Sequence, residues 1–153
     1  MNGHLDDHAG GAAAGSAAGT AVRAATRGDV SAIQALWRTA GLEPLDEDEL
    51  AATLEHGPGL LVLAEAPGAG VVGVVLGTFD GRRGWVHRLA VHPVHRRGGL
   101  ATALVTDLER RLHERGASRV NLLVLPENSG ALRFWQGRGY LPCPDVLHTK
   151  PLP

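Results

Sequence analysis

A stripe of leucines along residues 100–112 is the feature that most constrains how this chain folds. Its members recur at every fourth position: Leu100, Leu104, Leu108 and Leu112. That spacing is typical of one buried face of a helix, and Gly116 follows where a left-handed glycine often ends a helix. Residues 85–91, which follow a turn at Asp80 and Gly81, predict a strand just before it. The sequence therefore predicts a strand, a glycine-rich loop and an amphipathic helix packed against a sheet.

Strand and helix patterns alternate through the rest of the chain. Apolar or β-branched runs predict four more strands, over residues 21–25, 60–64, 71–79 and 120–125. Helical patterns cover residues 46–56 and 131–138, and a further helix begins after a Thr26 cap. The buried face of that helix is expected to carry Val30, Ile33, Leu36 and Trp37. From Tyr140 onward the chain is expected to be extended, and the whole order predicts a mixed α/β domain.

Composition sets the first 20 residues apart from the rest. They contain five glycines and six alanines, so we expect residues 1–20 to be a disordered tail and residues 21–153 a single domain. The lone Cys143 rules out an internal disulfide and suits a reducing compartment. No apolar run approaches the roughly 20 residues of a membrane-spanning helix. The sequence therefore predicts a cytoplasmic protein without a membrane partner.

Charge is distributed unevenly although the formal net charge is only −1. Residues 40–80 hold eight acids and no lysine or arginine, whereas residues 81–119 hold nine arginines and three acids. Local basicity attracts anions even where the net charge does not. Because the basic half has no nucleic-acid recognition motif and no regular alternation of aromatic residues with its arginines, we expect no nucleic-acid partner.

The loop at residues 96–102 has the features of an anion-binding site. The exposed N–H groups and the dipole at a helix start attract negative charge. Gly98 and Gly99 let a diphosphate approach the backbone, and Arg96 and Arg97 add positive charge. A plain glycine-rich cap with solvated arginines is the alternative interpretation of this loop.

Two motifs stand in order along the second half of the chain. Arg96, Gly99 and Ala101 fill a pattern of Arg or Gln, two residues, Gly, one residue, then Gly or Ala. The second motif consists of Asn128, Ala131, Phe134, Trp135, Gly139 and Tyr140. Together, and at this distance, they resemble the acyl-CoA-binding and second signatures of the GCN5-related N-acetyltransferase (GNAT) family. The resemblance covers the chain from about residue 21 to its end, and residues 79–84 and 89–93 look most like the bacterial YpeA-type acetyltransferases.

The resemblance implies an α/β (α+β) fold with a mixed, mostly antiparallel sheet, helices on both faces, and fourth and fifth strands that splay apart. It also implies acetyl-CoA as the cosubstrate, with no metal. Main-chain groups of Leu89, Ala90 and Val91 would bind the pantetheine arm. The pyrophosphate would lie on the loop and helix start: Arg96, Arg97, Gly98, Gly99, Leu100, Ala101 and Thr102. Three residues of the second motif would also contact the cosubstrate: Asn128, Ala131 and Trp135.

The catalytic residues depart from the family pattern. Trp135 stands where the family usually has a tyrosine that protonates the departing CoA thiolate. An indole N–H donates a hydrogen bond but does not titrate near neutral pH, so we expect Trp135 to orient the thioester or line the pocket. Trp85 stands where some members carry a glutamate base. His87, on the same strand face, is the candidate base, because an imidazole pKa near 6.5 suits proton abstraction; a structural histidine satisfied by a neighbour is the alternative.

Other motifs carry less weight. Residues 68–73 spell GxGxxG, but a strand rather than a helix is expected to follow, which argues against dinucleotide binding. His92 and His95 have no carboxylate or cysteine beside them, so no metal site is predicted. Cys143 has no evident activating partner and is not expected to act as a nucleophile.

The leading hypothesis is an enzyme that moves an acetyl group from acetyl-CoA to a primary amine of a small molecule or protein, by direct attack in a ternary complex. An acyl-CoA-binding module with little or no turnover is the alternative. The acidic residues from Glu43 to Glu55 form either a solvated helix face or the wall of an acceptor site that attracts a cationic amine. The sequence leaves open which amine is acetylated and whether the chain forms a homodimer.

Overall fold

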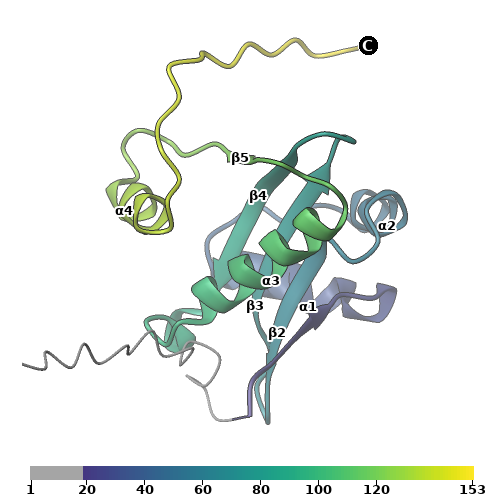
Figure 1. The fold of residues 1–153 in the computed structure, drawn as a ribbon. Helices are drawn as coiled ribbons and strands as arrows, with labels where there is room; N and C mark the ends of the chain where they lie inside the picture. The colour runs from purple at the N-terminus through teal and green to yellow at the C-terminus, as the bar shows by residue number, and fades with distance from the viewer. Residues whose placement is uncertain (1–18) are drawn as a thin grey trace, which may run out of the picture. The chain divides into compact units, whose positions relative to one another are not determined.

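The first unit of the protein is built on one five-stranded sheet. The computed structural model describes residues 19–153, and its compact units meet in the chain at Leu122 and Leu123. The strands stand in chain order: β1 (Ala21–Ala24), β2 (Leu61–Ala66), β3 (Gly70–Phe79), β4 (Gly84–Val91) and β5 (Val120–Leu122). Neighbours are antiparallel except β4 and β5, which run parallel (Figure 1). The predicted mixed, mostly antiparallel sheet is confirmed.

Helices cover both faces of this sheet. α1 (Val30–Thr39) and α2 (Glu47–His56) pack on one face, and α3 (Leu100–Glu114) lies across the other (Figure 1). The core under α1 and α2 includes Ile33, Trp37, Leu50, Leu63, Val74, Leu76 and Ala90. The buried face expected for the first helix is thereby confirmed. In the part of the chain that the structure describes, every helix is too short or too polar to cross a bilayer.

The leucine stripe of α3 packs directly on the backbone of the sheet. A Cβ atom added to Gly77 would lie 2.6 Å from Cδ1 of Leu108, closer than side chains normally approach. Gly73 and Gly84 make the same kind of contact with the leucines one turn before and one turn after. All three leucines are fully or almost fully buried. The glycines of β3 and β4 therefore form a groove that holds α3 in one register.

The second unit contains one helix, α4 (Ser129–Gly137). Residues 141–153 contain no helix or strand, in agreement with the extended segment expected from Tyr140 onward. The tail predicted for residues 1–20 lies, up to residue 18, outside the described residues. The prediction of a single domain over residues 21–153 stays a prediction.

The first helix begins later than the sequence pattern suggests. Thr26 caps a short 3-10 helix, η2 (Arg27–Asp29), and α1 starts only at Val30. The Asp29 carboxylate accepts a capping-box hydrogen bond from the Thr26 N–H at 2.8 Å and two bonds from Arg23, at 2.8 and 2.9 Å. The Arg23 guanidinium holds the pKa of Asp29 well below its usual range.

The fifth strand is shorter than predicted. The prediction of a strand over residues 120–125 was wrong at its end, because β5 ends at Leu122 after three residue pairs with β4. A strand persists only while a neighbour satisfies its backbone groups, and β4 pairs with β5 only from Gly84 to Val86. Leu123 and Leu125 lie in the second unit and are exposed.

The groove under α3 predicts a coupled stability effect. Gly77→Ala should lower the free energy of unfolding by about 1–3 kcal/mol, since the new methyl group overlaps Leu108. Urea unfolding of G77A, L108A and the double variant would measure this. Leu108→Ala removes the overlapping atoms, so it should cost less in the G77A background than in the parent chain. Simple additivity of the two costs would contradict the contact.

Candidate active site

The loop between β4 and α3 turns sharply into the helix. Gly99, with φ 80°, is the N-cap of α3, and Arg97, with φ 65°, also has a left-handed backbone. The first bond within the helix runs from Ala103 N to Gly99 O, at 3.0 Å. The N–H groups of the three preceding helical residues, Leu100, Ala101 and Thr102, therefore have no acceptor within the helix. The first turn of α3 contains no acid, so this helix start keeps its positive potential for an anion.

Hydrogen bonds fix this loop to the end of β4. Arg96 Nε donates to Val91 O at 3.1 Å, and His92 N donates to Val72 O at 2.8 Å. The ring of His92 caps the 3-10 helix η3 (Pro93–His95), because its Nδ1 accepts from Val94 N at 3.3 Å. Arg96 thus orders the loop as well as charging it. Both Arg96 and Arg97 have exposed side chains that can reach a ligand.

The edge of β4 that faces β5 is free beyond the first three residues. β5 pairs with β4 from Gly84 to Val86, whereas β3 pairs with β4 as far as Val91. Within the described chain, the edge at Leu89, Ala90 and Val91 accordingly has a strand on the β3 side only. The predicted splay of the fourth and fifth strands is confirmed. Main-chain groups on such an edge can bind an extended amide-containing ligand as a strand would.

His87 sits in a β-bulge of β4. Leu76 stands opposite Arg88 and Gly77 opposite Val86, so His87 is the extra residue in its strand. Its imidazole Nε2 lies 2.7 Å from Thr78 Oγ1. The ring stacks with Trp85 at a centroid distance of 6.4 Å and an interplanar angle of 18°, which confirms that the two side chains share a face.

The protonation of His87 is set by its partial burial. The side chain is exposed overall, but the atoms around the ring remove part of its hydration, and this desolvation lowers the pKa of His87 from its ordinary 6.5. A lowered pKa keeps the imidazole neutral at pH 7. A neutral imidazole has one free lone pair, which is the requirement for taking a proton from an amine.

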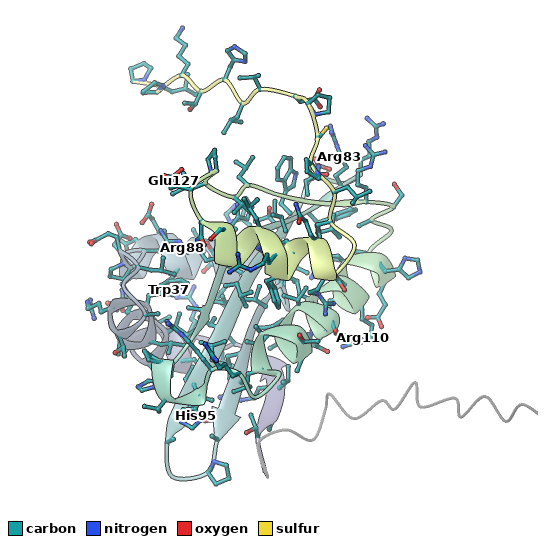
Figure 2. All side chains as sticks on the ribbon, turned by 90° about the vertical axis from the view of Figure 1, so that its left-hand side faces the viewer. Trp37, Arg83, Arg88, His95, Arg110 and Glu127 are labelled. Carbon is teal, nitrogen blue, oxygen red and sulfur yellow. The ribbon has the colours of Figure 1, made fainter. Side chains whose placement is uncertain are left out.

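Arg88 binds the connection between α1 and α2 to β4. Its Nη1 donates to Glu43 O, and its guanidinium carbon lies 5.0 Å from the centroid of the Trp37 ring (Figure 2). A cation above an indole face is held by electrostatic attraction. The segment before the acidic helix α2 is thereby held close to the strand that carries His87.

A cavity of about 320 Å³ opens on the α2 side of β3. Its lining includes Thr53 and His56 from α2, Thr78 from β3, and Arg115. This volume lies at the lower end of the roughly 300–1,000 Å³ usual for small-molecule pockets. Thr78 lines the cavity and also contacts His87, so one residue links the cavity to the candidate base.

The acids expected to attract an acceptor are partly engaged in the fold. Asp46 caps α2, with its Oδ1 accepting from Glu49 N at 2.7 Å, and Glu49 Oε2 accepts from Asp46 N at 3.2 Å. Glu55 is paired with Arg27. Glu47 and Asp48 are exposed in the first turn of α2. Among the described residues, no group of three or more His, Cys, Asp or Glu could hold a metal ion.

The second unit holds the residues of the second motif. Asn128 caps α4, because its Oδ1 accepts from Ala131 N at 3.0 Å, and its amide NH₂ is left to donate. Trp135 is buried, with the rings of Phe134 and Tyr140 edge-on to it at 4.9 and 5.1 Å. The structure brings these motif residues together with one another. Their membership of one site with the loop and β4 stays a prediction.

Sequence reasoning missed two neighbours of the candidate catalytic residues. Thr78 could not be assigned to His87, because the bulge that joins them has no sequence signature. Tyr140, the single tyrosine of the chain, was treated only as part of a motif, although it packs beside Trp135. The turn at Asp80 and Gly81 was the available signal for Thr78, because a hairpin through that turn pairs Thr78 with Trp85.

Known proteins resemble this chain in both sequence and fold. The acetyltransferase (GNAT) family matches residues 29–140. An acetyltransferase of Sodalis glossinidius is 35% identical over 115 residues, which cover 73% of this chain and 80% of that protein.

Solved structures agree. The chain resembles Ard1 from Thermoplasma volcanium, with a TM-score of 0.73, 21% identity, and coverage of 80% and 82% of the two chains. It also resembles the NatC complex bound to Gag peptide and CoA, with a TM-score of 0.71, 21% identity, and coverage of 80% and 85%. The family match and the bacterial relative show that this chain belongs to the GNAT family of N-acetyltransferases.

Proposed function

We propose that this acetyltransferase moves an acetyl group from acetyl-CoA to a primary amine while both substrates are bound. One observation carries the proposal: the N-terminus of α3, which has no side-chain cap, follows the splayed edge of β4 through a loop with two arginines. A helix start suits a pyrophosphate, and a free strand edge suits the amide groups of pantetheine. The relative solved with CoA supports the same choice of donor.

The residues of the first unit fit such a donor. The N–H groups of Leu100, Ala101 and Thr102, with the charges of Arg96 and Arg97, would hold the pyrophosphate. Gly98 leaves its surface open, since an added Cβ would meet only His95 O, at 3.8 Å. Main-chain groups of Leu89, Ala90 and Val91 would bind the pantetheine arm. Asn128, Ala131 and Trp135 would contact the donor from the second unit.

His87 would act on the acceptor. The bound donor supplies the acetyl group as a thioester. An amine enters as an ammonium ion, and His87 would take its proton, directly or through a water molecule. The freed lone pair would form the new C–N bond as the C–S bond breaks, and the departing CoA thiolate would take up the second proton of the acylated nitrogen through water. N–H groups of β4 would stabilise the negative charge that develops on the carbonyl oxygen.

Trp135 would serve in binding rather than in proton transfer. Its indole N–H can donate a hydrogen bond but cannot supply a proton near pH 7. Its burial between Phe134 and Tyr140 favours a packing function. The same observation favours the second candidate function, an acyl-CoA-binding module with little or no turnover, which the experiments below distinguish.

The acceptor, on this proposal, is a cationic amine of a small molecule or a protein. Two exposed acids at the start of α2, Glu47 and Asp48, support this choice. Later residues of the same helix line the cavity beside Thr78. The similarity to a complex solved with a peptide keeps protein amines among the acceptors. A cytoplasmic location is proposed as well, since the free thiol of Cys143 is exposed and suits a reducing compartment.

Arginine substitutions test the donor site. By calorimetry, Arg97→Ala and Arg96→Ala should each weaken acetyl-CoA binding about tenfold, because each removes a charge-assisted contact to the pyrophosphate. Arg96→Ala also removes the bond to Val91 O and should cost at least as much. Arg110→Ala, which changes an arginine paired with Asp107 and Glu114 further along α3, is the matched control. Unchanged affinity in the R96A/R97A variant would exclude this loop as the donor site.

Substitution of His87 tests the base. At pH 7, His87→Gln should lower kcat/KM at least about 100-fold. In the parent enzyme kcat/KM should fall as pH drops through the pKa of His87, below 6.5, because a lowered pKa moves protonation to lower pH. In H87Q the rate should follow only the ionisation of the acceptor amine.

The control for that test is His113→Gln, which changes an exposed histidine of α3. A pH profile of H87Q that matches the parent enzyme would show that His87 is not the base. Acetyl-CoA binding without release of free CoA, with every amine tried, would instead favour the binding-module function.

Acceptor charge can be tested with matched amines. A diamine or lysine peptide should show a KM about threefold or more below that of a primary amine of equal length that carries no further charge, and 0.5 M salt should remove the difference. Glu47→Gln with Asp48→Asn should raise the KM of the cationic amine only. Glu114→Gln, on the helix that covers the opposite sheet face, is the control. Equal KM values at low salt would contradict a cationic acceptor.

A further inference from the structure

Two adjacent strands bring a hydroxyl group to the candidate base. Thr78 stands opposite Trp85 in the antiparallel pairing of β3 and β4. The bulge adds His87 to β4 two residues after Trp85 and turns its ring back toward Thr78, with Oγ1 and Nε2 2.7 Å apart. This distance is normal for a strong hydrogen bond involving a hydroxyl group.

The ring of His87 is fixed by two contacts. Trp85 stacks with it nearly parallel, at an angle of 18°, and Thr78 binds one of its nitrogens. The stacking contact holds the plane of the ring, and the hydrogen bond keeps Nε2 directed at Thr78. Nδ1 is the ring nitrogen that neither contact uses. Arg88 is the next residue of β4, and its guanidinium turns toward Trp37 and Glu43. From α2, His56 lines the same cavity as Thr78.

We propose that Thr78 is a positioning residue that fixes the tautomer of His87, with hydrogen on Nε2, so that Nδ1 is the nitrogen that takes the proton of the acceptor amine. The proposal deepens the function proposed above and rests on His87 as the base. Thr78 touches neither substrate in this proposal; it acts through the imidazole.

With hydrogen on Nε2, proton transfer to Nδ1 leaves the bond to Thr78 intact, which is why we assign this tautomer. In the neutral ring, Nε2–H donates to Thr78 Oγ1 and Nδ1 carries the lone pair. When Nδ1 takes a proton from the ammonium group, both nitrogens carry hydrogen, and the bond from Nε2 to Thr78 is unchanged. In the other tautomer the hydroxyl donates to Nε2, so a proton could arrive there only after that bond breaks. Thr78 as acceptor serves both protonation states without rearrangement.

The tautomer is measured directly by long-range proton–nitrogen NMR of the full chain, which requires no acceptor amine. The His87 signals are assigned by their loss in H87Q. Above the pKa of His87, Nδ1 should have the shift of an unprotonated ring nitrogen and Nε2 that of a protonated one. Thr78→Ser keeps the hydroxyl and should preserve both shifts, whereas the isosteric Thr78→Val should move them toward a mixture of tautomers.

The same spectra report the pKa of His87. Thr78→Val should lower it by about 0.5, since the accepted hydrogen bond favours the cationic ring. A wild-type spectrum with hydrogen on Nδ1, or identical His87 shifts in wild type and T78V, would overturn the proposal.

Kinetics separate this proposal from the one on which it rests. With the amine that releases CoA fastest, T78V should lower kcat about threefold to tenfold with little change in KM, and T78S should retain the parent rate. If H87Q leaves kcat/KM unchanged, His87 is not the base and the proposed function of Nδ1 fails, whatever the NMR tautomer. If H87Q is impaired and T78V retains both the parent kcat and the parent pH profile, Thr78 does not position the base.

Discussion

The contact between the leucines of α3 and the glycines of the sheet fixes the geometry on which the proposed donor site depends. Leu104 lies on Gly73, which stands opposite Val91 at the end of β4, and Leu112 lies on Gly84 at its start. The helix therefore runs antiparallel to β4 and begins beside the last residues of that strand. Because interdigitated side chains and backbone leave no room to slide, the anion-attracting helix start is held at a constant offset from the splayed strand edge.

A second constraint acts within β4 itself. Without the bulge, strict alternation would put Trp85 and His87 on one face and Arg88 on the other. With it, Arg88 points to the same side as Trp85, over Trp37, while His87 reaches Thr78. One extra residue thus lets a single strand present a candidate base and also tie the α1–α2 connection. Bulges are frequent beside active sites because they re-aim side chains in this way.

Sequence patterns predicted the parts of the fold that rest on local periodicity. The leucine stripe, the loop at Arg96 and the strand runs of β2 and β3 follow from residue spacing, glycine placement and apolar runs. The Thr26 cap was confirmed, but the turn that follows it is a 3-10 turn, and α1 begins only at Val30. The end of β5 was wrong because strand length depends on a partner, and no local pattern records where β4 leaves it. The Thr78–His87 contact was missed because the hairpin register brings Thr78 only to Trp85, and the bulge that turns His87 toward Thr78 has no local pattern.

The energetics of amine acetylation explain why a tryptophan in the usual tyrosine position is compatible with turnover. Removing a proton from an alkylammonium group of pKa about 10.4 at pH 7 costs about 4–5 kcal/mol. Releasing a thiolate whose conjugate acid has a pKa of about 8.5 leaves an anion only about 2 kcal/mol above its protonated form at that pH. The demand on a base therefore exceeds the demand on an acid, and water can meet the smaller one. On the proposed mechanism, His87 beside Thr78 supplies the base, and Trp135 in its aromatic cluster with Phe134 and Tyr140 need not supply the acid.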